Sequence, residues 1–289
     1  MSDAQASPSS PNLAMIGSKN RSVAWYDPPI TTVNPILHDL LENYSHIPSE
    51  EVISRIIELR DKIWEVYPYP CIGQFRFLDL SLVRNPAYQT ILHRLTHDGD
   101  RILDVGCCLA PDLRKLAHDG VPPSSMYGLE MHSEYISMGY DFFNDKDSFA
   151  DANFIIGDLL DSENEEIRAV KGTFGIVNLS MFLHLWDFNG QVRACKRVVE
   201  LLRDEKGVLI VGQSVGDVVG REVTAGKRVI FKHNVETFKK MWKEVGEKMG
   251  TEWKVGAWLR DGMGIDGQTS KHWDEPGAKR LSFTVERVA

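Results

Sequence analysis

The sequence predicts an α/β protein with a mostly parallel sheet, an antiparallel last strand and a block of helices that precedes the sheet. From Asp100 onward, short apolar runs alternate with helical stretches, which is typical of parallel strands covered by helices on both faces. The preceding residues, from about 30 to 98, have helical periodicity and contain no convincing strand. A chain of 289 residues is long enough for one such domain with an appended block.

We expect three regions along the chain. Residues 1–22, rich in Ser, Pro, Asn and Ala, form a disordered tail; residues 23–98 form an N-terminal helical cap; and residues 99–289 form the α/β domain. Within the cap, Ser49 is expected to cap a helix that ends near the prolines at 68 and 70, and a further helix spans Asn85 to His97.

The α/β region has five expected strands with helices between them. The expected strands are Arg101–Val105, Ser125–Glu130, Asn153–Ile156, Phe174–Leu179 and Val208–Val211. The helical stretches are Asp112–His118, Ser133–Phe143, a short acidic piece near Glu163–Arg168, and Gln191–Arg203.

The last third of the chain has a different pattern. Gln213–His233, which contains several glycines, predicts a long loop. A helix from Val235 to Met249 is capped by Asn234 and closed by Gly250. Two strand-like runs then surround a Gly-rich loop, Asp261–Ala278. The final run, from Leu281 to Glu286, alternates strictly between apolar and polar residues and predicts an edge strand with one face in water.

Composition and charge exclude several classes of function. The 33 Lys and Arg residues are outnumbered by 41 Asp and Glu residues, which gives a net charge of −8, so a nucleic-acid partner is not expected. The cysteines form no C-x-x-C pair and have no His at metal-ligand spacing, so we expect neither a disulfide framework nor a metal site. No signal-peptide pattern and no apolar run of membrane-span length occur, which favours a cytoplasmic protein without a membrane span.

The most informative segment joins the first expected strand to the helix that follows it. A buried run ends with the acid Asp104, a tight turn follows at Gly106, and Pro111 opens the helix. In an open α/β sheet, ligands bind at the carboxyl ends of the strands. A carboxylate at this place suits a cationic ligand better than a pyrophosphate.

Two more acids occupy equivalent places. Glu130 ends the next strand, 24 residues after Gly106, where a carboxylate accepts hydrogen bonds from ribose hydroxyls. Asp158 follows the third strand, where a carboxylate can accept the exocyclic amine of an adenine. Three acids at successive strand ends therefore predict an adenosine with a positively charged appendage, which is S-adenosylmethionine (SAM).

This arrangement resembles the class I SAM-dependent methyltransferases, which have a Rossmann-like sheet. The resemblance implies that Asp104, Gly106 and Cys107 hold the amino-acid part of SAM, that Glu130 and Met131 hold the ribose and pack on the adenine, that Asp158 and Leu159 face the adenine edge, and that Asn178 lies beside the methionine portion. Cys108 and Ala110 depart from the family's pattern, because glycines are usual at both positions.

A closer resemblance covers most of the chain beyond the tail. Glu65–Ile72, Phe182–Asp187 and Met241–Gly246 are similar to segments of fungal methyltransferases of meroterpenoid biosynthesis. Those enzymes methylate polyketide–terpenoid intermediates, in several cases on a carboxyl group. The resemblance implies a small-molecule substrate, a secondary-metabolite pathway, S-adenosylhomocysteine as the product and a possible homodimer.

The need for a general base depends on the acceptor. A carboxylic acid is already ionised at neutral pH, whereas a phenol, with a pKa near 10, benefits from a base. His184 follows the fourth strand and is the candidate catalytic base, with a packing role as the alternative. His233 and His272 are expected on the surface. Cys107 and Cys108 are expected to be turn and core residues rather than nucleophiles, because no basic residue adjoins them.

Two further groups of residues have both a structural and a functional interpretation. The aromatic residues of the cap are expected to form helix core, with part of the group closing over the substrate; they are Trp64, Tyr67, Tyr69, Phe75 and Phe77. In the loop 213–233, Arg221, Lys227 and Arg228 are either solvated or paired with an acidic substrate.

Three functions compete. The favoured one is an O-methyltransferase that acts on a carboxyl group of a small apolar molecule, or on a phenol with His184 as base. A nicotinamide oxidoreductase requires G-x-G-x-x-G after the first strand, and only Gly106 is present. A non-catalytic, SAM-binding scaffold remains open because of the altered glycine loop.

Overall fold

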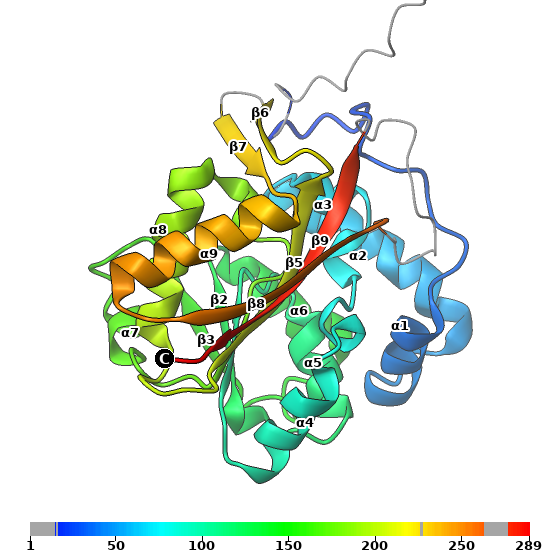
Figure 1. Ribbon diagram of the computed structural model, residues 1–289. Coiled ribbons are helices and arrows are strands. Elements are labelled where there is room, and N and C mark those ends of the chain that lie inside the picture. The colour runs from blue at the N-terminus through cyan, green and yellow to red at the C-terminus, as the bar shows by residue number, and fades with distance from the viewer. Residues whose placement is uncertain (1–14, 16, 226–227, 263–276) are drawn as a thin grey trace, which may run out of the picture.

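A seven-stranded sheet forms the centre of the molecule, for which a computed structural model describes residue 15 and residues 17–225, 228–262 and 277–289. Its strand order is β3-β2-β1-β4-β5-β9-β8 (Figure 1). Strands β3, β2, β1, β4 and β5 pair in parallel, and β9 pairs antiparallel with both β5 and β8. The sequence therefore predicted the sheet correctly: it is mostly parallel and its last strand is antiparallel.

The five strands expected between residues 101 and 211 begin and end close to their expected positions, with one exception. The observed strands are β1 Ile102–Val105, β2 Met126–Glu130, β3 Asn153–Ile156, β4 Ile176–Asn178, β5 Leu209–Asp217, β6 Arg221–Ala225, β7 Arg228–Lys232, β8 Trp253–Arg260 and β9 Ala278–Arg287. The exception is β5, which continues six residues beyond its expected end at Val211. Gly212, Gln213 and Ser214 have weak strand propensity, and continuous pairing with β9 compensates for it.

Nine α-helices lie within the described residues. They are α1 Pro35–Asp39, α2 Val52–Val66, α3 Pro70–Gly73, α4 Tyr88–His97, α5 Pro111–His118, α6 Ser133–Phe143, α7 Glu165–Ala169, α8 Phe188–Leu201 and α9 Val235–Met249. The Asn234 side chain and Thr237 form a capping box at the start of α9, and Gly250 ends the helix with a φ of 68°, as the sequence predicted. None of the helices in the described part of the chain is long and apolar enough to cross a bilayer.

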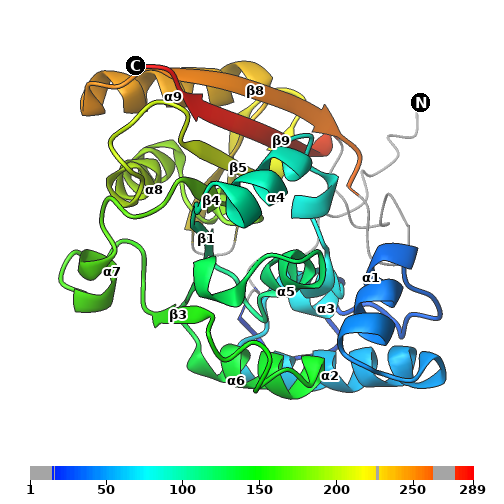
Figure 2. The ribbon, with the colours of Figure 1, turned by 90° about the horizontal axis from the view of Figure 1, so that it is seen from below.

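Alternate residues of the strands point to opposite faces of the sheet, and each face has its own core. Leu103 of β1 points into a core shared with α7, α8 and α9, whereas Ile102 points into a core shared with α4, α5 and α6. Figure 2 shows α8 and α9 on one side of the central strands and α4 and α5 on the other. Continuous burial of β1 and β4 on both faces follows from this layering.

A third core belongs to the helical block before the sheet. It joins α1, α2 and α3 to the loop after β1 and to α6, through residues that include Trp64, Phe75, Leu109 and Tyr135. No strand occurs among the described residues before Ile102. The expected cap at Ser49 is wrong: Pro48 precedes a 3₁₀ turn over Ser49–Glu51, and the Ser49 hydroxyl bonds the His38 ring at 3.0 Å instead of a helix N–H.

The final alternating run is not an edge strand, contrary to expectation. Strand β9 lies between β5 and β8, and β8 forms the edge. Arg280 and Ser282, on the polar face of β9, are both buried. The alternation therefore reflects one apolar core and one polar interior surface rather than a face in water.

The expected loop 213–233 is also replaced by strand structure. After β5 ends at Asp217, the chain forms a hairpin in which β6 and β7 pair antiparallel. The hairpin is rich in β-branched residues, including Val223, Thr224, Val229 and Ile230, which favour strands. Figure 1 shows this hairpin projecting beyond the upper end of β5.

Candidate cofactor and acceptor site

The turn after β1 has a left-handed backbone at alternate residues. Gly106, Cys108 and Ala110 have φ angles of 70°, 53° and 49°. The loop therefore keeps a glycine-type conformation although two of the three residues carry a Cβ. A Cβ on Gly106 would lie only 2.8 Å from the Phe182 ring, so only glycine fits this turn.

Glu130 connects that loop to the end of β2. Its carboxylate accepts backbone N–H bonds from Cys108 at 2.9 Å, Met131 at 2.8 Å and His132 at 3.1 Å. Glu130, the residue predicted to bind the ribose, thus lies beside the loop predicted to hold the amino-acid part of SAM. A carboxylate has about four acceptor directions, so ribose hydroxyls must share the oxygens with these N–H groups.

Asp104 and Asn178 meet across β1 and β4, as expected from their strand ends. The Asn178 amide donates to Asp104 Oδ1 at 2.8 Å, and both side chains are buried. Burial, reinforced by the negative charges of Asp112 and Glu130, raises the pKa of Asp104 well above its usual range, while the bond from Asn178 opposes the shift. A cationic group placed here would lower that pKa again and favour the carboxylate.

A chain of hydrogen bonds leads from Asn178 to the helical block. Ser180 donates to Asn178 Oδ1 at 2.8 Å. Ser81 Oγ lies 2.8 Å from Ser180 Oγ and 3.2 Å from an Asp112 oxygen, and its single proton is donated to one of these two acceptors at a time. Burial raises the pKa of Asp112 to about 7. Sequence analysis missed Ser81 and Asp112, since neither belongs to a strand-end motif.

The residues predicted to hold the adenine occupy different environments. Met131 is 58% exposed, so an apolar side chain stands free at the end of β2. Asp158 is also exposed and accepts the N–H of Leu160 at 2.9 Å in a tight turn. The Leu159 side chain is buried in the core with α8, which leaves its backbone as the part available to a ligand. Cys107 is likewise a buried core residue.

A buried ion pair that the sequence did not reveal supports the loop after β1 on its interior side. Arg114 pairs with Asp145 at 2.7 Å and donates to the Leu109 carbonyl at 2.6 Å, with side-chain exposures of 1% and 2% for the pair. Its guanidinium also lies 4.6 Å from the centre of the Phe143 ring. The loop conformation is therefore fixed by charge and packing in addition to its sequence.

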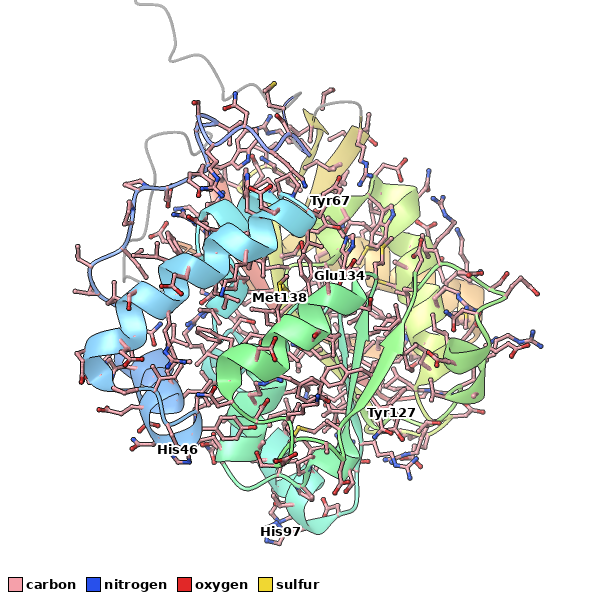
Figure 3. The ribbon with its side chains drawn as sticks, turned by 180° about the vertical axis from the view of Figure 1, so that it is seen from behind. His46, Tyr67, His97, Tyr127, Glu134 and Met138 are labelled. Carbon is pink, nitrogen blue, oxygen red and sulfur yellow. The ribbon has the colours of Figure 1, made fainter. Side chains whose placement is uncertain are left out.

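The helical block reaches the same edge of the sheet through its aromatic residues. Tyr67 stacks on the His132 ring at 5.7 Å, Tyr69 lies 3.4 Å from His132 Nε2, and Tyr135 donates to the Tyr67 carbonyl at 2.9 Å. Figure 3 shows Tyr67 above Glu134 of α6, with His97 at the lower end of the molecule. Part of the predicted aromatic group therefore covers the edge beside Glu130, while Trp64 and Phe75 are core residues.

His184 lies in a 3₁₀ turn, Leu183–Leu185, after β4. Its Nδ1 atom is buried and has no hydrogen-bond partner. Burial, together with the positive charge of Lys232, lowers the pKa of His184 from 6.5 to about 4. The imidazole is therefore neutral at physiological pH and binds a proton weakly.

His233, Cys107 and Cys108 do not add a catalytic group. His233 is buried, contrary to the expected surface position, because Phe188, Phe231 and Phe238 surround its ring. His272 lies outside the described residues. Burial raises the pKa of the Cys107 and Cys108 thiols well above the usual value, which makes them poor nucleophiles, as expected.

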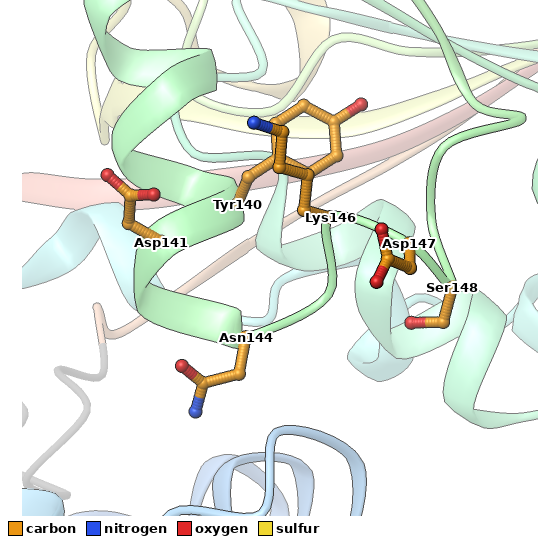
Figure 4. A pocket seen from close by; sticks show the side chains of 6 residues that line it. All are labelled: Tyr140, Asp141, Asn144, Lys146, Asp147 and Ser148. Atoms are coloured by element: carbon orange, nitrogen blue, oxygen red, sulfur yellow. The ribbon is translucent and has the colours of Figure 1, made fainter.

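Other surface features lie away from this edge. Figure 4 shows an open depression at the far end of α6, lined by Tyr140, Asp141, Asn144, Lys146, Asp147 and Ser148. The described residues contain no group of three or more His, Cys, Asp or Glu side chains that could hold a metal ion.

The donor and acceptor groups at the strand ends fit SAM. The buried Asp104 is a carboxylate without a cation, Glu130 offers ribose-type acceptors, and Met131 offers an exposed apolar surface. The turn at Gly106 carries no side chain of its own, and the Phe182 ring packs against it where a Cβ would stand. This sheet order and these strand-end acids define a class I, SAM-dependent methyltransferase.

Comparisons with known proteins identify the family. Residues 25–78 match the meroterpenoid methyltransferase N-terminal domain. The chain is 37% identical to O-methyltransferase atr3 of Stereocaulon alpinum over 93% of this chain and 77% of the relative. It is 39% identical to O-methyltransferase phiE of a fungal species, over 93% of this chain and 94% of the relative, and 36% identical to methyltransferase adrK of Penicillium roqueforti, over 91% and 92%.

The solved structures agree on the fold. The carbon methyltransferase CurJ has a TM-score of 0.51 at 12% sequence identity, over 90% of this chain and 72% of that chain. The protein belongs to the fungal meroterpenoid methyltransferase family, and it is an enzyme whose methyl donor is SAM. The resemblance deduced from the sequence is confirmed.

Proposed function

We propose that this methyltransferase esterifies a carboxyl group of a small, largely apolar meroterpenoid precursor. The observation that carries the proposal is the state of His184, whose pKa is lowered to about 4. A phenol with a pKa of about 10 would transfer its proton to such an imidazole with an equilibrium constant of roughly one in a million. A carboxylic acid with a pKa of about 4 is already ionised and needs no base.

The residues around the site then act by positioning and by excluding water. When bound, SAM would supply a sulfonium methyl group for in-line displacement by a carboxylate oxygen, with the thioether sulfur as the leaving group. Phe182 packs edge-on against Trp186 at 5.0 Å beside the Gly106 turn, and Tyr67 and Tyr69 cover the neighbouring edge. A dry, ordered site of this kind can account for most of the acceleration of a displacement reaction.

The relatives support the substrate class. Their family model is described as a meroterpenoid methyltransferase domain, and two of the relatives are named O-methyltransferases. A cytoplasmic location, a homodimer and the boundaries at residues 22 and 98 are further parts of the proposal. Light scattering of the purified chain would test the homodimer, and imaging of a tagged chain would test the location. Expression of residues 99–289 alone would test the boundary at residue 98.

The test compares His184→Asn with wild type on carboxylic-acid and phenol acceptors, using SAM with a labelled methyl group. His97→Asn, an exposed histidine at the far end of the molecule, is the matched control. We expect base-labile ester product, a rate that is flat between about pH 6 and 9, and at least about a third of the activity in His184→Asn.

The opposite results point to the other functions. Product confined to phenols, with a loss of about a hundredfold in His184→Asn, would replace the ester with a phenol ether and make His184 the base. Binding of S-adenosylhomocysteine without turnover on any acceptor would support a scaffold.

A further inference from the structure

Four arginines from distant parts of the chain gather on the polar face of β5, β9 and β8. They are Arg76, Arg84, Arg260 and Arg280. Arg76 and Arg84 belong to 3₁₀ turns of the helical block, Arg76–Leu78 and Leu82–Arg84, and the other two belong to β8 and β9. We call this group the arginine cluster.

Strand register and close contacts bring three of the guanidinium groups together. Arg260 and Arg280 are directly opposite each other in the β8–β9 ladder, so their side chains share one face. Arg76 Nη1 and Arg280 Nε each lie 3.5 Å from the position that a Cβ on Gly262 would occupy. These two nitrogens are therefore at most 7 Å apart, the sum of the two distances.

Half of the arginine cluster is neutralised by protein groups. Arg84 forms an ion pair with Asp79, Gln213 donates to the other Asp79 oxygen at 3.1 Å, and Arg260 donates to Gln213 at 3.0 Å. Burial and the positive charge of Arg84 nevertheless lower the pKa of Arg260. One carboxylate thus serves two cations, directly or through an amide.

The other two arginines of the cluster, Arg76 and Arg280, have no counter-ion among the residues that the structure describes. Arg280 is only 8% exposed, and its guanidinium forms no hydrogen bond or ion pair with a described residue. Arg76 Nε and Ser282 Oγ are buried without a partner, and Ser282 is the next residue on the same face of β9. Buried cations and donors are normally paired, because burial without a partner removes the hydrogen bonds that water would supply.

The arginine cluster lies beside the site described above. The Gln213 carbonyl accepts the N–H of Met181 at 2.6 Å, three residues after Asn178, at the end of β4. Asp79 is two residues from Ser81, whose hydroxyl bonds Ser180 at the same strand end. The unpaired donors therefore lie on the β4–β5 side of the site, across from the predicted ribose contact at Glu130.

We propose that Arg76 and Arg280, with Ser282 Oγ, bind the carboxylate of the methyl acceptor. The inference rests on the proposed function and names its substrate-recognition residues. Guanidinium groups hold carboxylates through paired N–H bonds, which fixes the plane of the group. One oxygen is held by the arginines, and a lone pair of the other attacks the methyl group. The C–S bond electrons leave with sulfur, and no proton is transferred.

The test measures equilibrium binding of two acids and their neutral amides to the full chain in the presence of S-adenosylhomocysteine. The probes are 2-naphthoate with 2-naphthamide, and adamantane-1-carboxylate with its carboxamide. The variants are Arg76→Gln, Arg280→Gln and Arg280→Lys, with Arg168→Gln, an exposed arginine of α7, as the matched control. Binding of S-adenosylhomocysteine and the midpoint of thermal unfolding report on the fold of each variant.

We expect wild type to bind each acid at least about tenfold more tightly than its amide. Both glutamine variants should lose this preference, while Arg280→Lys keeps part of it and Arg168→Gln keeps all of it. Affinity for S-adenosylhomocysteine should change by less than about threefold. Because Arg280 has no partner in the described structure, Arg280→Gln should leave the thermal midpoint unchanged or raise it.

Three outcomes would overturn the proposal. They are an equal affinity of wild type for acids and amides, a preference that survives in both glutamine variants, and a loss of S-adenosylhomocysteine affinity with the preference retained. The last would assign the arginines to the carboxylate of the cofactor. Failure of the proposed function can be distinguished from failure of this proposal, because binding is measured without methyl transfer. A preference for acids without ester formation would refute esterification but would still support the arginine binding site.

Discussion

The two sides of the site differ in how their charged groups are satisfied. On the cofactor side, formed by the ends of β1 and β2 with the loop at 106–110, Glu130 accepts three backbone bonds and Arg114 is paired with Asp145. On the proposed acceptor side, formed by β5, β9, β8 and the arginine cluster, Arg76 Nε and Ser282 Oγ are buried without partners among the described residues. The loop on the cofactor side is thus held by bonds within the protein, and only Asp104 there lacks a cation among the described residues, whereas the acceptor side keeps donors free for a ligand.

The largest expected effect comes from breaking the buried ion pair between Arg114 and Asp145, which supports the cofactor loop. Arg114→Met should lower the free energy of unfolding by about 3–5 kcal/mol, because it leaves the Asp145 carboxylate buried without its cation. Urea denaturation followed by circular dichroism measures the change. Arg55→Met, which removes the exposed partner of Glu51, is the matched control and should cost less than about 1 kcal/mol. Equal losses in both variants would show that the Arg114 pair contributes no more than a surface pair.

The second effect concerns cofactor affinity. Glu130→Ala should weaken binding of S-adenosylhomocysteine by about a hundredfold, or about 2.7 kcal/mol, because the ribose acceptors and the N–H bonds to the loop are lost together. Isothermal titration measures the dissociation constant. Glu134→Ala, four residues further on the exposed face of α6, should bind as wild type does. An unchanged affinity in Glu130→Ala would remove this residue from the cofactor site.

The positions of the acids at the strand ends could be predicted from the sequence, whereas the arginine cluster could not, for a physical reason. Asp104, Glu130 and Asp158 each follow a short apolar run, so their positions are a local property of strand, turn and helix. The meeting of Arg76 with Arg280 depends on pairing between β9 and β8 and on the packing of the helical block, none of which has a local signature. The polar residues of β9 were interpreted as facing water for the same reason.

A third prediction concerns the pH dependence of stability. Burial lowers the pKa of His233 from 6.5 to about 3, so the folded protein takes up this proton less readily than the unfolded chain. Its contribution to stability is present above pH 6.5 and is lost as the pH falls from 6.5 towards 3, by about 1 kcal/mol between pH 7 and 5.5. Thermal midpoints of wild type and His233→Gln across this range should converge on acidification. A constant difference between the two curves would show that His233 titrates normally.

The smallest expected effect tests whether the cofactor loop is strained. Ala110 has a φ of 49°, a conformation that costs a residue with a Cβ about 1–2 kcal/mol. Ala110→Gly relieves this cost but loses a buried methyl group and adds backbone entropy to the unfolded chain, so we expect a net gain of only about 0.5 kcal/mol.

Ala117→Gly makes the same chemical change within α5, where the backbone is right-handed, and should destabilise the protein by about 1 kcal/mol. Opposite signs for the two substitutions, measured as shifts in the unfolding midpoint, would show that the loop holds its glycine-type conformation against the preference of its own residues. Equal losses of stability in the two variants would mean that packing of the Ala110 methyl group contributes more than its left-handed backbone costs. The conformation of the cofactor loop would then depend on Glu130 and Arg114 alone.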